Sequence, residues 1–211
     1  MKTIIFDFDG TIADTLSLIL EITDKLAKKY SYNKITKKDV LRLREKTYAE
    51  ASREVGKFGV SVFRLPFLLR EGKDLMAKEV TSCKPFSGLV EALKTLKEKG
   101  FSLGILTSNF QKNVELFLKK NNLEIFDFIY SDNSPFLLGK GDKLKKLIEK
   151  NHWRQDEVVY VGDETRDVEA AKKAGVKIIS VSWGFNSKKI LQKQQPDFLI
   201  NKPEELKELR I

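Results

Sequence analysis

The spacing of hydrophobic residues divides the chain into two kinds of segment. Residues 3–8 form a short, apolar and β-prone run that ends at Gly10, which predicts a buried strand followed by a turn. From residue 15 to residue 83 the apolar residues recur at helical spacing, and no stretch there predicts a strand. Thr36, with Asp39 three residues later, predicts the start of one of these helices. We therefore expect a helical insertion directly after the first strand.

From Pro85 onward, short apolar runs alternate with amphipathic segments. We expect strands at 101–107, 126–131, 157–162, 176–181 and 197–200, accompanied by helices at 87–99, 110–121, 141–151, 166–174 and 203–209. Repeated strand–helix units with apolar strands predict an α/β fold built on a doubly wound parallel sheet. Because the first strand belongs to that sheet, we expect a core domain of residues 1–14 and 85–211 and a helical cap domain of residues 15–84.

Polar residues collect just after the predicted strands, which is where ligands bind in sheets of this kind. The first strand delivers Asp7 and Asp9. Residues two apart on a strand point to the same side, so both carboxylates can reach one site. Gly10 permits a sharp turn, and Thr11 then offers a hydroxyl and a backbone N–H. This segment is the first candidate for chemistry.

Later segments bring further polar groups to the same edge of the predicted sheet. Asp163 and Asp167 follow one strand, and a turn of helix beginning there would bring their side chains together. The other groups expected at this edge are Thr107, Ser108 and Asn109 after an earlier strand, and Lys140 just before a helix. The edge is therefore expected to combine carboxylates with hydroxyl, amide and ammonium groups.

This combination of groups predicts phosphoryl chemistry. Carboxylates gathered at one edge repel one another without a cation, and Mg²⁺ is a hard ion that takes oxygen ligands and retains waters. A carboxylate beside Mg²⁺ can attack phosphorus and form an aspartyl phosphate. Lys140 and the groups at 107–109 would hold the phosphoryl oxygens, and Asp9 would exchange protons with the leaving oxygen and the attacking water. These residues predict a Mg²⁺-dependent phosphatase.

The same residues resemble the motifs of the haloacid dehalogenase-like (HAD) superfamily. The segment 7–11 looks like its first motif, and Thr107 or Ser108 matches the hydroxyl of its second. Lys140 resembles its third motif, and Gly-Asp-x-x-x-Asp at 162–167 resembles its fourth. The helical insertion lies where this superfamily carries its type 1 cap. The resemblance covers essentially the whole chain and is greatest to phosphoglycolate-phosphatase-like members, which implies a Rossmann-like core.

The resemblance also implies a role for each carboxylate. Asp7 is the expected nucleophile, and Asp9 is the expected general acid and base. Mg²⁺ is expected on the Asp7 carboxylate, the Asp9 backbone carbonyl and Asp163, with Asp167 bound directly or through water. The expected product of the first step is an aspartyl phosphate on Asp7.

Two positions in the expected site have competitors. Thr107 is favoured over Ser108 as the hydroxyl of the second motif, because it directly follows the apolar run. Lys140 is favoured over Lys143 as the phosphate-binding lysine, although the loop lacks the Lys-Pro pair common in close relatives. The residues expected to contact the substrate are Thr11, Ser108 and Asn109.

Composition narrows the class of protein and of chemistry. Hydrophobic residues make up 41% and charged residues 33%, which is typical of a globular protein. The single cysteine, Cys83, and the single histidine, His152, argue against a disulfide, a cysteine-rich zinc site and a histidine relay. No apolar run approaches the roughly 20 residues needed to cross a bilayer. We therefore expect a cytoplasmic protein without a membrane partner.

The positive charge is concentrated in the insertion. Residues 15–84 hold 16 Lys and Arg against nine Asp and Glu, a net of +7 within a chain total of +9. This charge is either a solvated surface or an attraction for anionic substrates or nucleic acid. We expect a small phosphorylated metabolite as the partner, and a monomer or homodimer. The candidate cap residues for binding it are Arg42, Arg44, Lys46 and Arg64.

Two other functions stay open. A sugar-phosphate mutase of the same superfamily shares Asp7 and Asp9, so the sequence hardly separates it from a hydrolase. An anion- or nucleic-acid-binding protein would use the basic cap. Nucleic acid is not expected as the main partner, because the chain has no regular interleaving of basic and aromatic residues and no known binding motif.

Overall fold

The strands of the protein form one parallel sheet. The computed structural model describes residues 2–131 and 139–208. Within them, six strands lie in the order β3-β2-β1-β4-β5-β6, and each pairs in parallel with its neighbours. The strands are β1 (Thr3–Phe6), β2 (Ser102–Thr107), β3 (Phe128–Ser131), β4 (Val158–Gly162), β5 (Lys177–Val181) and β6 (Phe198–Ile200). The prediction of an α/β fold with a doubly wound parallel sheet is confirmed.

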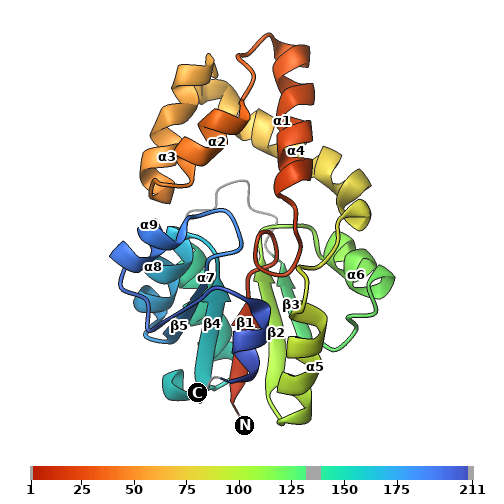
Figure 1. Ribbon diagram of the computed structural model, residues 1–211, viewed down its shortest axis with the longest axis vertical. Helices are drawn as coiled ribbons and strands as arrows, with labels where there is room; N and C mark the ends of the chain where they lie inside the picture. Colours follow the sequence, from red (N-terminus) through yellow and green to blue (C-terminus); the bar gives the residue numbers. More distant parts are fainter. Residues whose placement is uncertain (1, 132–138, 209–211) are drawn as a thin grey trace.

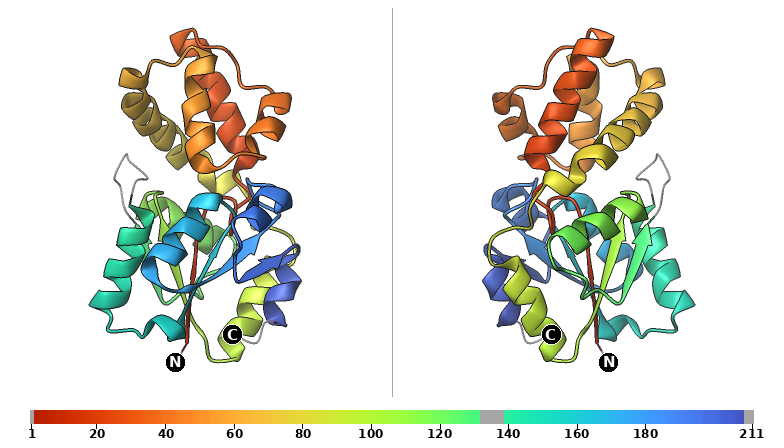
Figure 2. Two further views of the ribbon diagram at one scale, coloured as in Figure 1. Left: turned by 90° about the vertical axis from the view of Figure 1, so that its left-hand side faces the viewer. Right: turned by 90° about the vertical axis from the view of Figure 1, so that its right-hand side faces the viewer.

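Helices cover both faces of the sheet, as the two side views in Figure 2 show. Ile4 and Phe6 of β1 join an apolar cluster with residues of α5 (Leu89–Glu98) and α6 (Gln111–Lys120). Ile5 joins the opposite cluster, with residues of α7 (Lys140–Lys150) and α8 (Thr165–Ala174). Both faces of a parallel sheet are buried, which explains why β1 is a continuous apolar run rather than an alternating one.

The helical insertion lies beyond the carboxyl ends of the strands, in the upper half of Figure 1. Its helices are α1 (Leu16–Tyr30), α2 (Lys37–Leu43), α3 (Tyr48–Glu54) and α4 (Leu65–Glu79), with short 3₁₀ turns at Val55–Phe58, Val62–Arg64 and Val80–Ser82. Thr36 and Asp39 form the expected capping box at the start of α2. No strand occurs between residues 15 and 83, as predicted. We call residues 15–84 the cap segment.

The two connections between the sheet and the cap segment run side by side. Ala13 pairs with Pro85 in an antiparallel bridge, and the Asp14 N–H donates to the Lys84 carbonyl at 2.9 Å. Both crossings therefore lie at one place above β1. The proposed domain boundaries at residues 14/15 and 84/85 fall within this paired crossing and stay a prediction.

Three local features differ from the sequence-based expectations. β1 ends at Phe6 rather than at residue 8, because the Phe8 carbonyl instead accepts the N–H groups of Ile12 and Ala13, and Gly10 turns the chain with φ of 77°. The helix expected at 203–209 is a 3₁₀ turn at Pro203–Lys207, and residue 209 lies outside the described residues. A short helix, α9 (Lys188–Lys193), was not predicted. Only long and strongly periodic segments give a clear helical signal.

Among the helices in the described ranges, none is both long and apolar enough to pass through a lipid bilayer.

Candidate active site

Asp7 is held at the carboxyl edge of the sheet by main-chain and charged contacts. Its N–H donates to the Val161 carbonyl at 2.8 Å, which continues the pairing of β1 with β4 by one residue. Its Oδ1 accepts the Phe8 N–H at 2.8 Å, and its Oδ2 lies 2.8 Å from Lys140 Nζ. The side chain is buried, so its position is set by these contacts rather than by water.

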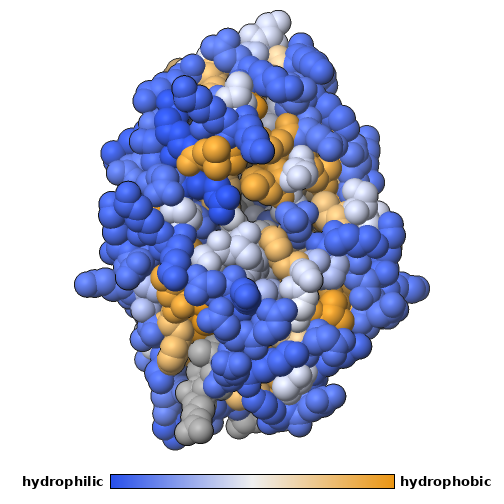
Figure 3. Space-filling model, viewed as in Figure 1, coloured by the Kyte–Doolittle hydropathy of each residue, from blue (hydrophilic) through white to orange (hydrophobic). Residues whose placement is uncertain are grey.

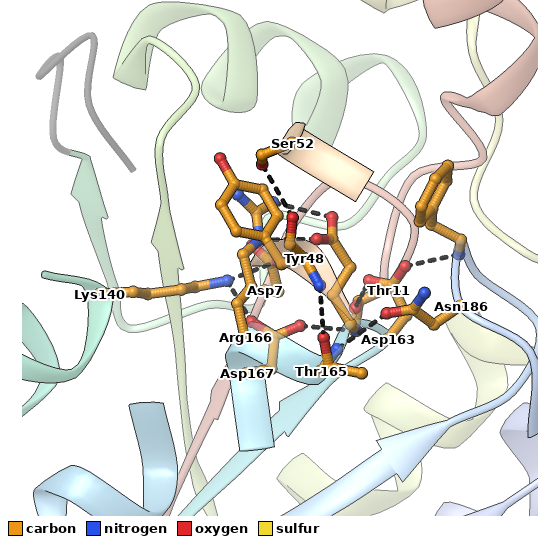
Figure 4. A network of polar contacts seen from close by, with 12 residues as sticks. Asp7, Thr11, Tyr48, Ser52, Lys140, Asp163, Thr165, Arg166, Asp167 and Asn186 are labelled. Carbon is orange, nitrogen blue, oxygen red and sulfur yellow. Dashed lines mark hydrogen bonds and ion pairs between the residues drawn. The ribbon is translucent and has the colours of Figure 1, made fainter. Parts of the chain in front are cut away.

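Asp163 and Asp167 approach Asp7 from the end of β4, as Figure 4 shows. Asp163 is fully buried and accepts the Thr11 hydroxyl at 2.7 Å and the Phe185 N–H at 2.7 Å. Asp167 Oδ2 accepts the Glu164 N–H at 2.9 Å, which completes a capping box at the start of α8. The helix start expected after β4 therefore brings the two carboxylates to one place.

These three carboxylates form a group that can hold a metal ion. Asp7, Asp163 and Asp167 each offer an oxygen, and the three oxygens lie within 4.8 Å of one another. Glu164 lies beside them and is partly buried, while Lys140 and Arg166 are the nearby cations. A buried excess of carboxylates and an all-oxygen donor set fit a hard divalent cation such as Mg²⁺. The residues present therefore fit the ion that the sequence predicts.

The electrostatics of the site reflect that excess of negative charge. Burial, reinforced by the charges of Glu164, Asp167 and Asp7, raises the pKa of Asp163 well above its usual range. Burial and the charge of Asp7 raise the pKa of Asp9 to about 6. Burial alone would lower the pKa of Lys140. The nearby carboxylates of Asp167 and Asp7 have the larger combined effect and raise this pKa well above its usual range. The lysine is therefore a fixed positive charge.

Lys140 is the lysine that contacts the aspartates. As the first residue of α7, it forms ion pairs with both Asp7 and Asp167. Its ammonium also lies over the ring of Tyr160, 5.4 Å from the centroid. Lys143 shares with it the lining of a small cavity, together with Leu106, Thr107, Ser108 and Arg166. The geometry therefore favours Lys140, while both hydroxyl candidates lie at this cavity.

The segment after β2 contacts Asp9. Asn109 is buried, and its Nδ2 donates to Asp9 Oδ2 at 3.5 Å. The Asn109 N–H donates to the Thr107 hydroxyl at 3.0 Å, which orients the loop. Asp9 lines a second, larger cavity and stands outside the group of three metal-binding carboxylates. Its carboxylate is thus placed toward the space where a leaving group would lie.

Thr11 lies at the site but faces a different group from the one expected. Its side chain is fully buried, and its hydroxyl donates to Asp163. The structure therefore brings Thr11 to a candidate metal ligand. Its predicted contact with substrate stays a prediction.

Arg166 is a charged group of the site that sequence reasoning missed. Its guanidinium pairs with the Glu164 carboxylate, with Nε 2.8 Å and Nη2 2.9 Å from the two oxygens. The guanidinium also lies over the ring of Tyr48 in α3, 4.9 Å from the centroid. Its position inside the motif 162–167 could have identified it, because an arginine in the first turn of α8 lies at the same edge of the sheet as the aspartates. Nothing in the sequence points to Tyr48.

Asn186 joins the cap segment to the core and was also missed. Its Oδ1 accepts the Thr165 N–H at 2.9 Å, and its Nδ2 donates to the carbonyls of Arg44 and Lys46 at 3.2 and 3.1 Å. The Tyr48 N–H donates to the Thr165 hydroxyl at 2.9 Å beside it. These bonds hold residues 44–48 of the cap segment against the start of α8.

A cavity of about 440 Å³ lies between the cap segment and the core. Asp9, Asp163 and Arg166 line its catalytic end, and helices of the cap segment form its other walls. The four cap residues expected to bind an anion do not line it. Arg42 and Lys46 form ion pairs with Glu54, at 3.4 and 2.9 Å. The Arg44 guanidinium donates to the Gly184 carbonyl at 3.2 Å, and Arg64 is exposed. These four basic residues are therefore not part of the cavity wall, whereas Lys73 of α4 does line it.

Comparison with known proteins shows the family and agrees with the fold. The sequence profile of the family described as haloacid dehalogenase-like hydrolase matches residues 4–181. A phosphoglycolate phosphatase of Synechococcus elongatus is 34% identical over 206 residues, which span 98% of this chain and 95% of that protein. The pyrophosphatase PpaX of Anoxybacillus flavithermus is 29% identical over 213 residues, covering 98% of this chain and 95% of that protein.

A solved structure extends the likeness to three dimensions. The haloacid dehalogenase-like family protein SP0104 of Streptococcus pneumoniae superimposes with a TM-score of 0.81, at 20% identity, over 98% of this chain and 96% of that one. The chain therefore belongs to the haloacid dehalogenase-like hydrolase family. Within that family it is an enzyme of the phosphatase class, as the sequence predicted.

Proposed function

We propose that the protein is a Mg²⁺-dependent phosphatase that hydrolyses a small phosphomonoester through a phosphoryl group carried on Asp7. The observation that carries this proposal is the convergence of Asp7, Asp163 and Asp167 on one point, with Lys140 paired to two of them. A buried carboxylate beside a permanent cation and a metal-binding group has the surroundings that phosphoryl transfer needs.

The metal would be held by the side chains of Asp7, Asp163 and Asp167, with the backbone carbonyl of Asp9 as a further ligand by likeness to the family. When bound, Mg²⁺ supplies positive charge that neutralises the phosphoryl oxygens. Thr11 and the Phe185 N–H fix the orientation of Asp163 through their hydrogen bonds. Such outer contacts orient ligands and are part of the design of a metal site.

Residues of this chain account for each proton and bond in the proposed reaction. The Asp7 carboxylate attacks phosphorus, and the bond from phosphorus to the alcohol oxygen breaks. Asp9 donates its proton to that oxygen, and the alcohol leaves. Water then attacks the aspartyl phosphate while Asp9 takes up its proton, which releases phosphate and restores Asp7. Lys140 and the hydroxyl groups at 107–108 hold the phosphoryl oxygens.

We further propose that the substrate is a phosphorylated metabolite and that the enzyme works in the cytoplasm as a monomer or homodimer. Residues 1–14 and 85–211 would act as the catalytic core, and residues 15–84 as a cap that closes over it. The bonds from Asn186 to residues 44 and 46 support a cap that docks beside α8. Closure of this kind excludes water from the reacting groups.

A panel of phosphate esters assayed with and without Mg²⁺ tests the proposed function. Asp7→Asn is expected to lower the release of inorganic phosphate by at least about 10³-fold, because it removes the nucleophile. Asp156→Asn makes the same chemical change at an exposed position and is the matched control. Full activity in Asp7→Asn, or equal activity after Mg²⁺ is chelated, would contradict the mechanism. Formation of an isomeric phosphate without release of phosphate would favour a mutase instead.

A further inference from the structure

The cavity between the cap segment and the core is long and mostly apolar. It follows α1 from Leu16 through Ile19 and Ile22 to Leu26, which is about 15 Å along the helix axis at 1.5 Å per residue. Leu68 of α4 and Phe58 form the wall opposite the catalytic end. Apolar side chains also gather between α2 and α1 on the face drawn in Figure 3, above the catalytic edge. A volume of about 440 Å³ falls in the usual range for ligand pockets.

The charges on the cavity wall argue against an anionic leaving group. Among the described lining residues, the cations are Lys73 of α4 and Arg166, and Arg166 is already paired with Glu164. Four carboxylates line the same space, namely Asp9, Asp14, Asp163 and Glu164. A carboxylate or second phosphate on the leaving group would therefore lie among apolar side chains and like charges, which costs free energy.

The Tyr32 side chain lines the far end of the cavity. Tyr32 follows the end of α1, and its hydroxyl is buried without a hydrogen-bond partner among the described residues. A buried hydroxyl left unpaired is costly, and a ligand with a polar group at its far end would satisfy it. The cavity therefore has the candidate catalytic groups at one end, apolar side chains along its length and a polar group at the other end.

We propose that the cavity binds the leaving group, and that the substrate is the phosphate monoester of an extended apolar alcohol. This inference rests on the proposed phosphatase function. The alcohol chain would lie along α1, with its esterified oxygen beside Asp9 and its tail between α1 and α4. The leaving group then differs from those of phosphoglycolate and pyrophosphate, the compounds named in two relatives, because those leaving groups are themselves anionic.

A series of primary alkyl phosphates tests the inference, because every member has the same leaving-group chemistry. With ethyl, butyl, hexyl and octyl phosphate, each below its aggregation concentration, kcat/KM is expected to rise about fourfold per methylene buried. Propyl phosphate has nearly the shape of phosphoglycolate but lacks its carboxylate. We expect its kcat/KM to exceed that of phosphoglycolate by at least about tenfold.

Gly72 of α4 offers a way to block the cavity without touching the reacting groups. Gly72 lines the cavity, and a Cβ at this position would lie 3.7 Å from Leu26 and 3.9 Å from Ile22, so a methyl group fits there without a clash. Gly72→Phe is expected to lower the ratio of octyl to ethyl kcat/KM by at least about 30-fold. Gly72→Ala adds one methyl group and should keep most of the ratio. Arg70→Phe, on the exposed side of α4, is the matched control.

The outcomes separate the inference from the proposed function. A steep rise with chain length that Gly72→Phe removes and Arg70→Phe keeps supports the inference. Phosphate release that is independent of chain length, or faster from phosphoglycolate than from propyl phosphate, overturns the inference and leaves the phosphatase function intact. If no ester releases phosphate with Mg²⁺ present, both the proposed phosphatase function and the proposed substrate class are wrong. Ala51→Phe, on the α3 wall, replaces Gly72→Phe if that variant does not fold.

Discussion

Replacing Lys140 with methionine removes the cation that joins two of the candidate metal ligands. The side chain is 12% exposed, and its ammonium lies 2.8 Å from Asp7 and in contact with Asp167, which is fully buried. Methionine keeps the length and apolar stem of lysine, so the change isolates the charge. Asp7, Asp163 and Asp167 would then face one another with Arg166 as the remaining nearby cation.

The size of the effect follows from the burial of these pairs. At an effective dielectric constant of about 20, one ion pair at this separation is worth about 6 kcal/mol of Coulomb energy, part of which offsets the desolvation of the lysine. Removing one partner of a buried pair costs about 3 to 5 kcal/mol in practice. For a protein of this size, that corresponds to a fall in Tm of roughly 10 °C. We also expect kcat to fall by about 10² to 10³-fold, because a donor to the phosphoryl oxygens is lost.

Thermal unfolding and steady-state phosphate release measure the two effects. Lys143→Met is the matched control, because it makes the same chemical change at a half-buried lysine in the same turn of α7. It should keep kcat within about fivefold of the parent. The reasoning is refuted if Lys140→Met unfolds within about 2 °C of the parent and keeps its kcat. If Lys143→Met alone loses activity, the phosphate-binding lysine is Lys143.

Two further changes test contacts that the tertiary structure brings together. Gly184→Ala would place a Cβ 2.3 Å from the Gly10 carbonyl oxygen and 2.3 Å from Asp163 Cβ, so we expect weaker Mg²⁺ binding and a loss of activity of at least about tenfold, measured by metal titration. Arg166→Lys keeps the charge but loses the planar stack on Tyr48, worth about 1 kcal/mol, so kcat/KM should fall about fivefold. An unchanged metal affinity in the first variant, or an unchanged kcat/KM in the second, would contradict these assignments.

Much of the architecture was predictable from the sequence because it depends on short-range patterns. The apolar runs at 3–8, 101–107 and 157–162 are strands in the structure, apart from shifts of one or two residues at their ends. The class of enzyme followed from the motifs, and it is confirmed by membership of the family. Parallel strands deliver their carboxyl ends to one edge, so residues far apart in sequence were expected to meet there.

The roles of the individual site residues are predictions from the motifs. The structure brings Asp7, Asp163, Asp167 and Lys140 together as expected, but the roles of nucleophile, metal ligand and phosphate-binding lysine stay predictions. Lys143 competes with Lys140 in sequence, and only the ion pairs with the aspartates favour one over the other. A difference of three residues is one turn of a helix, which the spacing of motifs alone does not resolve.

The sequence by itself determined the sheet, the catalytic edge and the charge of the cap segment, because each is a property of local pattern or of composition. Only the tertiary structure decided where that charge points. Arg42 and Lys46 pair with Glu54 inside the cap segment, while Leu26 and Leu68 line the space above Asp9. A net charge sums over all faces of a helix, whereas binding depends on the one face that meets the ligand. That face is set by packing between helices that are distant in sequence.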